Sequence, residues 1–438
     1  MSAISRAPEV DALAQRYRTV RAASLALAEP LSAEDCALQS MPDASPTKWH
    51  LAHTSWYFET FALEPALPGY RPFEPAFRVL FNSYYNGVGP QYARPQRGLL
   101  ARPSLPAVLA YREHVDRHLL RLLEDDKLDS ALRDVILLGT HHEQQHQELI
   151  LTDLLHLFAQ NPLAPVYREP AARPVHGAAA APVRFVAIPG GLREVGYAGA
   201  GFAFDNEGPR HRVYLEPFAL ASRPVTNREY LAFVDAGGYR DPEPWLSDGW
   251  AAVQRNGWEA PLYWQRRSDA WWTFTLGGAR ALALDEPVTH VSFYEADAYA
   301  RWAGARLPTE VEWEVAAGDA PVAGNTAENG ALHPRPASAQ VSRSEPKANE
   351  DHQVGDGLAQ LFGDVWEWTR SAYEPYPGYA PPPGALGEYN GKFMANQIVL
   401  RGGSCATPAD HLRASYRNFF YPDARWQFSG VRLAKDDA

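Results

Sequence analysis

The residues best able to do chemistry lie in one helix-forming stretch of the 438-residue chain, residues 139–150, which reads GTHHEQQHQELI. His142 and His146 are four residues apart, so a helix presents both imidazoles on one face, where they can bind one metal ion. Apolar residues recur at helical spacing on both sides, and Gln-Asn-Pro at residues 160–162 is typical of a helix end. We therefore expect a metal-binding helix that enters an apolar core.

The same residues also match the H-E-x-x-H pattern of zinc peptidases, in which Glu143 would act as the base for a metal-bound water. Such a short pattern recurs by chance, and the polar side of an amphipathic helix is a purely structural alternative. Burial of polar groups costs free energy, however, so Glu, Gln and His crowded into an apolar segment favour a functional role. The peptidase interpretation stays open at this point.

A catalytic metal site needs a third protein ligand and open positions for substrate. Residues 49–56 offer His50 and His53, which are three residues apart and can share one helix face. The spacing does not choose between them. Three imidazoles without a carboxylate favour iron, zinc or copper.

Residues 81–90 form a loop-like segment with two adjacent phenols, Tyr84 and Tyr85. A phenol can serve an active site as a proton donor. Packing of aromatic rings is the simpler interpretation if the segment is taken alone.

Two further segments carry groups suited to substrate binding. Arg94, Arg97 and Arg102 form a short basic stretch, in which a guanidinium can bind a carboxylate bidentately or remain a solvated loop residue. Residues 418–422 combine an amide with successive aromatic rings, and this combination suits a quaternary ammonium group through cation–π contact.

Helical periodicity predicts four helices that must position these groups, at about residues 10–27, 49–63, 105–123 and 132–160. Four such helices form a bundle whose interior can hold metal ligands from different helices. An Ala- and Pro-rich stretch then predicts a linker, and short aromatic, Gly- and Pro-rich segments follow. We expect an α+β protein with a helical domain at 8–165, a linker at 166–182 and a mixed domain at 183–436.

The composition excludes several classes of function. The chain has 41 Lys and Arg against 52 Asp and Glu, a net charge of −11, which argues against binding to nucleic acid or an anionic membrane. Its two cysteines, Cys36 and Cys405, support neither a disulfide framework nor a cysteine-ligated metal. Without a signal sequence or a membrane-spanning stretch, the expected location is the cytoplasm. The oligomeric state does not follow from the sequence.

Eight motifs, in the same order along nearly the whole chain, resemble those of the ergothioneine-biosynthesis sulfoxide synthases. They are QSMPD (39–43), SPTKWHLAH (45–53), FNSYY (81–85), RGLL (97–100), HEQQHQE (142–148), RLPTE (306–310), GDVWEW (363–368) and RGGS (401–404). The resemblance implies a DinB-like four-helix bundle followed by a formylglycine-generating-enzyme-type domain with a C-type-lectin-like fold. It also implies a non-haem Fe(II) held by His53, His142 and His146, with His53 preferred to His50.

In this family O2 is consumed while a sulfoxide-bearing C–S bond forms between a thiol and the imidazole of hercynine, Nα-trimethylhistidine. The resemblance implies that Gln145 contacts the imidazole of the substrate. Tyr84 and Tyr85 match the tyrosine pair of the branch that uses free cysteine, where a phenol gives a proton or hydrogen during oxygen use.

The resemblance also places Asn418, Phe419 and Phe420 at the trimethylammonium group of the substrate. Where this chain has Phe420, the branch that uses γ-glutamylcysteine has an acidic residue, so cysteine is the expected thiol. Arg94 is the candidate for binding the cysteine carboxylate. The expected partners are therefore the small molecules hercynine, cysteine and O2.

Related activities remain as alternatives. A selenoneine synthase, which uses a selenosugar, shares the metal motif, whereas the ovothiol type usually carries a methyltransferase domain for which this chain has no room. Formylglycine-generating enzymes use paired cysteines, and only Cys405 is present in the C-terminal segment. A non-catalytic binding protein built on the lectin-like half would need no metal in the bundle.

Overall fold

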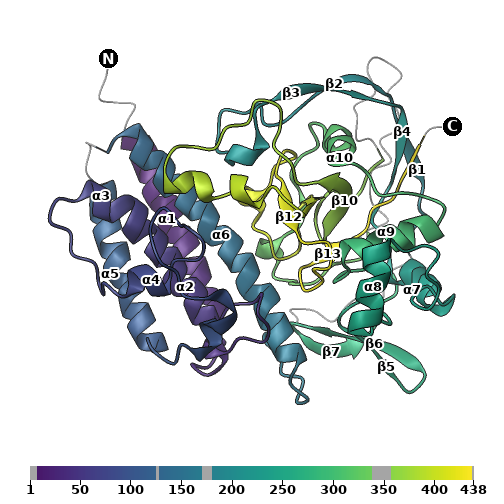
Figure 1. Ribbon diagram of the computed structural model, residues 1–438, viewed down its shortest axis with the longest axis horizontal. Helices are drawn as coiled ribbons and strands as arrows, with labels where there is room; N and C mark the ends of the chain where they lie inside the picture. Colours follow the sequence, from purple (N-terminus) through teal and green to yellow (C-terminus); the bar gives the residue numbers. More distant parts are fainter. Residues whose placement is uncertain (1–6, 125–127, 170–179, 338–356, 437–438) are drawn as a thin grey trace. The chain divides into compact units, whose positions relative to one another are not determined.

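The computed structural model describes residues 7–124, 128–169, 180–337 and 357–436, and the chain forms two compact units (Figure 1). Unit 1 comprises Met1–Arg168 together with Pro382–Tyr389, and unit 2 comprises Glu169–Pro381 and Asn390–Ala438. A short segment from late in the chain thus belongs with the N-terminal unit. The expected linker lies largely outside the described residues, which omit 170–179.

Within the described residues, unit 1 is built around four long helices (Figure 1). They are α1 (Ala7–Ala28), α2 (Thr47–Phe58), α5 (Leu105–Leu123) and α6 (Ser130–Ala159). Shorter helical segments are Asp35–Ala37, the π-helical Glu59–Leu63 that continues α2, α3 (Glu64–Ala66), α4 (Phe77–Leu80), Arg94–Leu99 and Ala385–Glu388. The helical N-terminal region predicted from periodicity is confirmed.

Local sequence signals explain where helices α5 and α6 begin. Ser104 accepts a hydrogen bond from the Ala107 N–H at the start of α5, and Asp129 accepts one from the Leu132 N–H at the start of α6. Each cap satisfies a backbone donor that has no partner inside its helix. Both helices therefore start at residues that the sequence itself marks.

Gly139 allows α6 to pack closely against α2. A Cβ at this position would lie 2.4 Å from a ring carbon of Phe58 and 2.6 Å from one of Tyr57. A glycine inside a helix costs about 1 kcal/mol relative to alanine, so its presence reflects this close approach. The contact brings the histidines of the two helices into one interior.

Glu143 is the centre of a buried ion-pair network that joins α1, α5 and α6. Its Oε2 lies 3.0 Å from Arg21 Nη1, and its Oε1 lies 2.8 Å from Arg112 Nη2 and accepts a hydrogen bond of 2.6 Å from Ser24 Oγ. Burial raises the pKa of this carboxyl, but the two guanidinium groups outweigh burial and hold the pKa at about 2. The carboxylate thus stays ionised and fully paired.

We expect Glu143→Gln to lower the free energy of unfolding by about 3–5 kcal/mol at pH 7, because two buried guanidinium groups lose a charged partner. Urea unfolding followed by circular dichroism measures this change. A matched control is Glu64→Gln, which breaks a more exposed pair with Arg78 at 2.8 Å and should cost at most about 1 kcal/mol.

The contribution of Glu143 to stability should also depend on pH in a definite direction. The folded-state pKa of Glu143 is about 2, below the ordinary value of 4.5. Its contribution to stability is therefore present above pH 4.5 and is lost as the pH falls through 2. The difference between wild type and Glu143→Gln should shrink over this range, and a pH-independent difference would contradict the assignment.

Unit 2 is a loop-rich mixture of short sheets and helices, which confirms the α+β class. One three-stranded sheet has the order β1 (Phe185–Ile188), β4 (Phe218–Ala221), β14 (Ala434–Asp436), and a four-stranded sheet has the order β12 (Asn418–Phe420), β11 (Ile398–Arg401), β10 (Trp366–Ala372), β13 (Ser429–Gly430). Smaller sheets are β2 (Gly191–Val195) with β3 (His211–Leu215), β5 (Trp264–Arg267) with β6 (Ala270–Thr275) and β7 (Gly278–Ala281), and β8 (Gly324–Asn325) with β9 (Phe362–Gly363). The helices are α7 (Asn227–Asp235), α8 (Ser247–Asn256), α9 (Phe293–Trp302) and α10 (Glu310–Ala317), with 3₁₀ turns at Asp205–Glu207, Ala327–Asn329, Gly391–Phe393 and Ala409–His411.

The motifs of the second half build the core of unit 2. Glu310, at the start of α10, pairs with Arg401 Nη2 at 2.8 Å and with Arg417 Nε at 2.9 Å. Glu367 on β10 pairs with Arg432 at 2.7 Å in the same way. Because buried charges must be paired, these ion pairs have a structural role: they link elements that are distant in sequence.

Among the described residues, no helix combines the length and apolar character needed to cross a membrane.

Candidate metal centre

Three histidines of unit 1 bring their ring nitrogens together. His53 comes from α2, and His142 and His146 come from successive turns of α6. One nitrogen from each lies within 4.8 Å of the others. His53 and His142 are buried and His146 is half-buried, so the cluster is largely shielded from solvent.

The nitrogens of His53 and His142 are spaced as two ligands of one ion would be. His53 Nδ1 lies 2.6 Å from the Phe81 carbonyl, which can only accept, so Nδ1 carries the proton and Nε2 presents a lone pair. His53 Nε2 is 3.2 Å from His142 Nε2. Two nitrogens about 2.1 Å from one metal ion and at right angles to each other would be about 3 Å apart. The donor set therefore fits a metal.

His50, the other histidine of the 49–56 segment, lies behind His146 and outside the cluster. Its Nδ1 is 2.8 Å from His146 Nδ1, and its Nε2 is 3.1 Å from Asp153 Oδ2. Since Nδ1 of His146 is engaged with His50, its Nε2 is the nitrogen available to a metal.

The three histidines of the cluster are neutral at pH 7. Burial lowers the pKa of His142 to about 3. Burial also lowers the pKa of His53 and His146 well below the ordinary value, and the neighbouring imidazoles lower both further. A neutral imidazole is the form that binds a metal, so no proton has to leave these rings before binding.

An aromatic wall connects the cluster to a buried arginine. The Trp49 ring stacks on His53 with centroids 4.6 Å apart, and the Arg97 guanidinium carbon lies 3.4 Å from the Trp49 ring centroid. Arg97 is buried, and burial lowers the pKa of its guanidinium. Arg94, the residue favoured from sequence, is exposed, and its guanidinium donates to the Asp43 carbonyl.

The tyrosine pair sits on a turn that starts at the residue holding His53. Asn82 follows Phe81 and closes the turn, because its Nδ2 donates to the Tyr85 carbonyl at 3.0 Å and its Oδ1 accepts from the Tyr85 N–H at 3.0 Å. The Tyr84 and Tyr85 rings stack at 4.6 Å. Burial, and then the neighbouring Tyr84, raise the pKa of Tyr85 well above its ordinary value, so its phenol keeps its proton.

Sequence reasoning missed Tyr389, which the late segment of unit 1 contributes to the centre. Its hydroxyl donates a hydrogen bond to Gln145, 244 residues away in the chain, and its ring centroid is 5.6 Å from that of His142. The preceding residue, Glu388, accepts hydrogen bonds from the backbone N–H groups of Asn86 at 3.0 Å and Gly87 at 2.6 Å. A single Tyr among Gly and Pro carries no periodic signal that could have pointed to this contact.

The residues expected at a trimethylammonium group belong to unit 2. Asn418, Phe419 and Phe420 form β12, which pairs with β11. The Phe419 ring stacks on Tyr373 with a centroid distance of 3.9 Å, and Phe420 meets Trp426 edge-on at 6.0 Å. The segment thus lies among aromatic rings, a type of side chain that can contact a cationic ligand.

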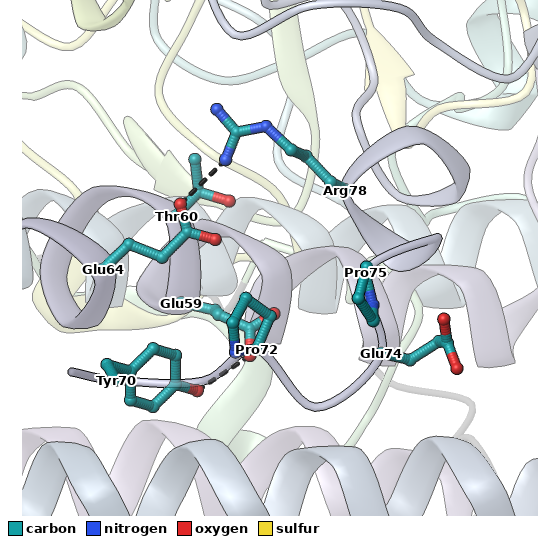
Figure 2. A pocket seen from close by; sticks show the side chains of 8 residues that line it. All are labelled: Glu59, Thr60, Glu64, Tyr70, Pro72, Glu74, Pro75 and Arg78. Atoms are coloured by element: carbon teal, nitrogen blue, oxygen red, sulfur yellow. Dashed lines mark hydrogen bonds and ion pairs between the residues drawn. The ribbon is translucent and has the colours of Figure 1, made fainter.

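Unit 1 also has a pocket of about 400 Å³ apart from the histidines (Figure 2). It is lined by Glu59, Thr60, Glu64, Tyr70, Pro72, Glu74, Pro75 and Arg78. Its carboxylates are already engaged: Glu59 accepts from the Tyr70 hydroxyl at 2.7 Å, Glu64 pairs with Arg78 at 2.8 Å, and Glu74 accepts from a backbone N–H at 3.1 Å. We therefore take the histidine cluster, and not this pocket, as the candidate site.

The contacts of Glu143 argue against the zinc-peptidase interpretation. A general base needs a free oxygen near the reacting water and a pKa near the working pH. Both oxygens of Glu143 are held by Arg21, Arg112 and Ser24, and the pKa of the carboxyl is about 2. The glutamate next to the first α6 ligand therefore serves the fold.

Comparisons with known proteins cover both units. The DinB superfamily matches residues 16–150, and the sulfatase-modifying factor enzyme 1-like domain matches residues 173–437. Hercynine oxygenase from Mycolicibacterium thermoresistibile is 36% identical over 408 residues, which cover 90% of this chain and 88% of that protein. Hercynine oxygenase from Mycobacterium tuberculosis is 35% identical, covering 97% of this chain and 99% of that protein. Formylglycine-generating enzyme from Streptomyces coelicolor is 33% identical, covering 64% of this chain and 96% of that protein.

Proposed function

Because the chain belongs to the hercynine oxygenase family, with a DinB-like helical region followed by a C-type-lectin-like domain, we propose that it is an Fe(II)- and O2-dependent sulfoxide synthase of ergothioneine biosynthesis. It joins the thiol of cysteine to the imidazole of hercynine. The family is one of oxygenases, and small molecules such as hercynine are its substrates. The three-histidine cluster of unit 1 is the observation that carries the proposal.

The proposed reaction balances without an external reductant. One imidazole C–H bond and the cysteine S–H bond give way to a C–S bond, and the sulfur gains one oxygen atom. These changes remove four electrons from the two substrates, and O2 accepts them. One oxygen atom enters the sulfoxide and the other leaves as water with the two released protons.

In this proposal His53, His142 and His146 hold the iron. Bound iron supplies the place where the thiol and O2 meet and exchange electrons. The histidines contribute three neutral nitrogens in fixed orientation, which leaves positions for both substrates.

The remaining residues bind and orient the substrates. Gln145, itself held by Tyr389, contacts the hercynine imidazole, and Tyr84 and Tyr85 keep phenolic protons available for the reaction. The Tyr85 phenol remains protonated at neutral pH because burial raises its pKa.

Asn418, Phe419 and Phe420 serve the trimethylammonium group, and Phe420 in place of an acidic side chain favours cysteine as the thiol. Arg94 binds the cysteine carboxylate, with the buried Arg97 beside Trp49 as a second guanidinium within the same basic segment. The proposal keeps a helical domain at 8–165, a mixed domain at 183–436 from which residues 382–389 join unit 1, and a cytoplasmic location.

The experiment that tests the function is product analysis. The protein is loaded with Fe(II) anaerobically and then given hercynine, ¹⁸O-labelled O2 and one donor: cysteine, γ-glutamylcysteine or a selenosugar. We expect hercynyl-cysteine sulfoxide carrying one ¹⁸O atom, read by mass spectrometry, and no such product from protein loaded with Zn(II), which has no redox chemistry.

The three sulfur or selenium donors distinguish the alternative activities. A γ-glutamylcysteine adduct would change the thiol, and a selenium adduct would favour selenoneine synthesis, which shares the metal motif. An iron-loaded protein that forms no adduct with any donor would reject the proposed function.

A further inference from the structure

A line of polar side chains runs from the histidine cluster into the interior of unit 1. His146 Nδ1 lies 2.8 Å from His50 Nδ1, and His50 Nε2 lies 3.1 Å from Asp153 Oδ2. His50 is 2% exposed and Asp153 is 6% exposed, so water does not compete for these contacts. His146 and Asp153 belong to α6, and His50 reaches between them from α2.

The carboxylate at the end of this line determines where the protons lie. A carboxylate only accepts, so His50 Nε2 must carry a hydrogen. Neutral His50 then has a lone pair at Nδ1 and accepts the hydrogen of His146 Nδ1. The lone pair of His146 is thereby directed to its Nε2, the nitrogen available to a metal.

Asp153 is itself held in place. Its Oδ2 also accepts a hydrogen bond of 2.8 Å from the Ser45 N–H, just before α2, whereas its Oδ1 has no hydrogen-bond partner in the part of the chain that the structure describes. The carboxylate therefore contacts His50 directly and makes no ion pair with a Lys or Arg among the described residues, although the buried Arg97 lies close enough to attract it electrostatically.

The other two histidines lack such support. His53 Nδ1 is held by a neutral backbone carbonyl, and His142 Nδ1 has no partner among the described residues. Of the three, His146 is the histidine whose far nitrogen connects, through one imidazole, to an anionic group. This difference between His146 and the other two histidines indicates a role beyond packing.

We propose that Asp153 and His50 are positioning residues that fix the tautomer of His146 and increase electron donation from its Nε2 to the bound metal. The inference rests on the metal centre of the proposed function. Partners of this kind orient the ligand and raise its basicity, and their loss typically weakens metal binding about 10–100-fold.

The test compares Asp153→Asn with wild type in two measurements that need no substrate. The first is Fe(II) affinity, from anaerobic competition with a chelator. The second is the Fe(III)/Fe(II) midpoint potential. We expect affinity to fall about 10–100-fold and the potential to rise, because a less donating ligand stabilises Fe(III) less.

Two further variants separate positioning from structural support. Asp116→Asn removes a carboxylate of the same bundle that pairs with Arg21 at 2.7 Å, so it should lower the melting temperature and leave affinity and potential unchanged. His50→Ala should reproduce the Asp153→Asn effects, and the double variant should add little, because the two residues act through one line of contacts.

The outcomes are distinguishable. If wild type binds Fe(II) and Asp153→Asn lowers only the melting temperature, as Asp116→Asn does, the positioning role is overturned while the metal centre stands. If wild type binds no Fe(II), the metal centre fails and this inference fails with it.

Discussion

His53→Ala should abolish stoichiometric iron binding. The substitution removes the one ligand that α2 contributes and leaves two imidazoles of α6, too few for a stable site with open positions. Iron content after anaerobic reconstitution, measured by elemental analysis, tests this expectation, and product formation should be lost together with the metal.

His156→Ala is the matched control for this variant. His156 also lies on α6, but its Nδ1 contacts Ser40 at 2.7 Å, outside the cluster, so this variant should keep its iron. Circular dichroism establishes that both variants are folded. Stoichiometric iron and activity in His53→Ala would refute the assignment of His53 as a ligand.

Combined replacement of Tyr84 and Tyr85 by Phe should suppress C–S coupling while iron binding survives. Both rings remain, so the stacked pair and its packing against Trp56 are preserved, but the phenolic protons are gone. Since a positioned proton donor contributes about 10²–10⁴-fold to rate, turnover should fall by about that factor.

Mass spectrometry of the product and iron analysis of the same samples measure the two effects separately. Tyr70→Phe serves as the control, because it removes a half-buried phenol that hydrogen-bonds Glu59 in the pocket apart from the histidines (Figure 2). Unchanged turnover in the double variant would remove the proposed role of the pair, and the two single variants then identify the reacting phenol.

Much of the fold followed from local pattern. The periodic apolar positions predicted the helices around α2, α5 and α6, and the caps at Ser104 and Asp129 are themselves sequence signals. Helices are specified by neighbours within a few residues, so their existence can be inferred without knowing the fold. The short strands of unit 2 were expected only as a class, because their pairing joins segments that are far apart in the chain.

The candidate site likewise has features set by local sequence and features set by tertiary packing. The sequence by itself determined that His142 and His146 share one helix face, since a spacing of four residues requires no tertiary information. It left His50 and His53 as equal candidates until the family resemblance favoured His53. Both share a helix face, and only the packing of α2 against α6 decided that His53 joins the cluster while His50 supports His146.

The tertiary structure alone decided three further points. Glu143, part of a catalytic-looking motif, is held by arginines from two other helices. Tyr389 reaches Gln145 across 244 residues, and Asp153 reaches His146 through His50. The physical reason is common to all three: a side chain's protonation and role depend on the charges and hydrogen-bond partners that packing brings to it, and these come from parts of the chain that no local pattern connects.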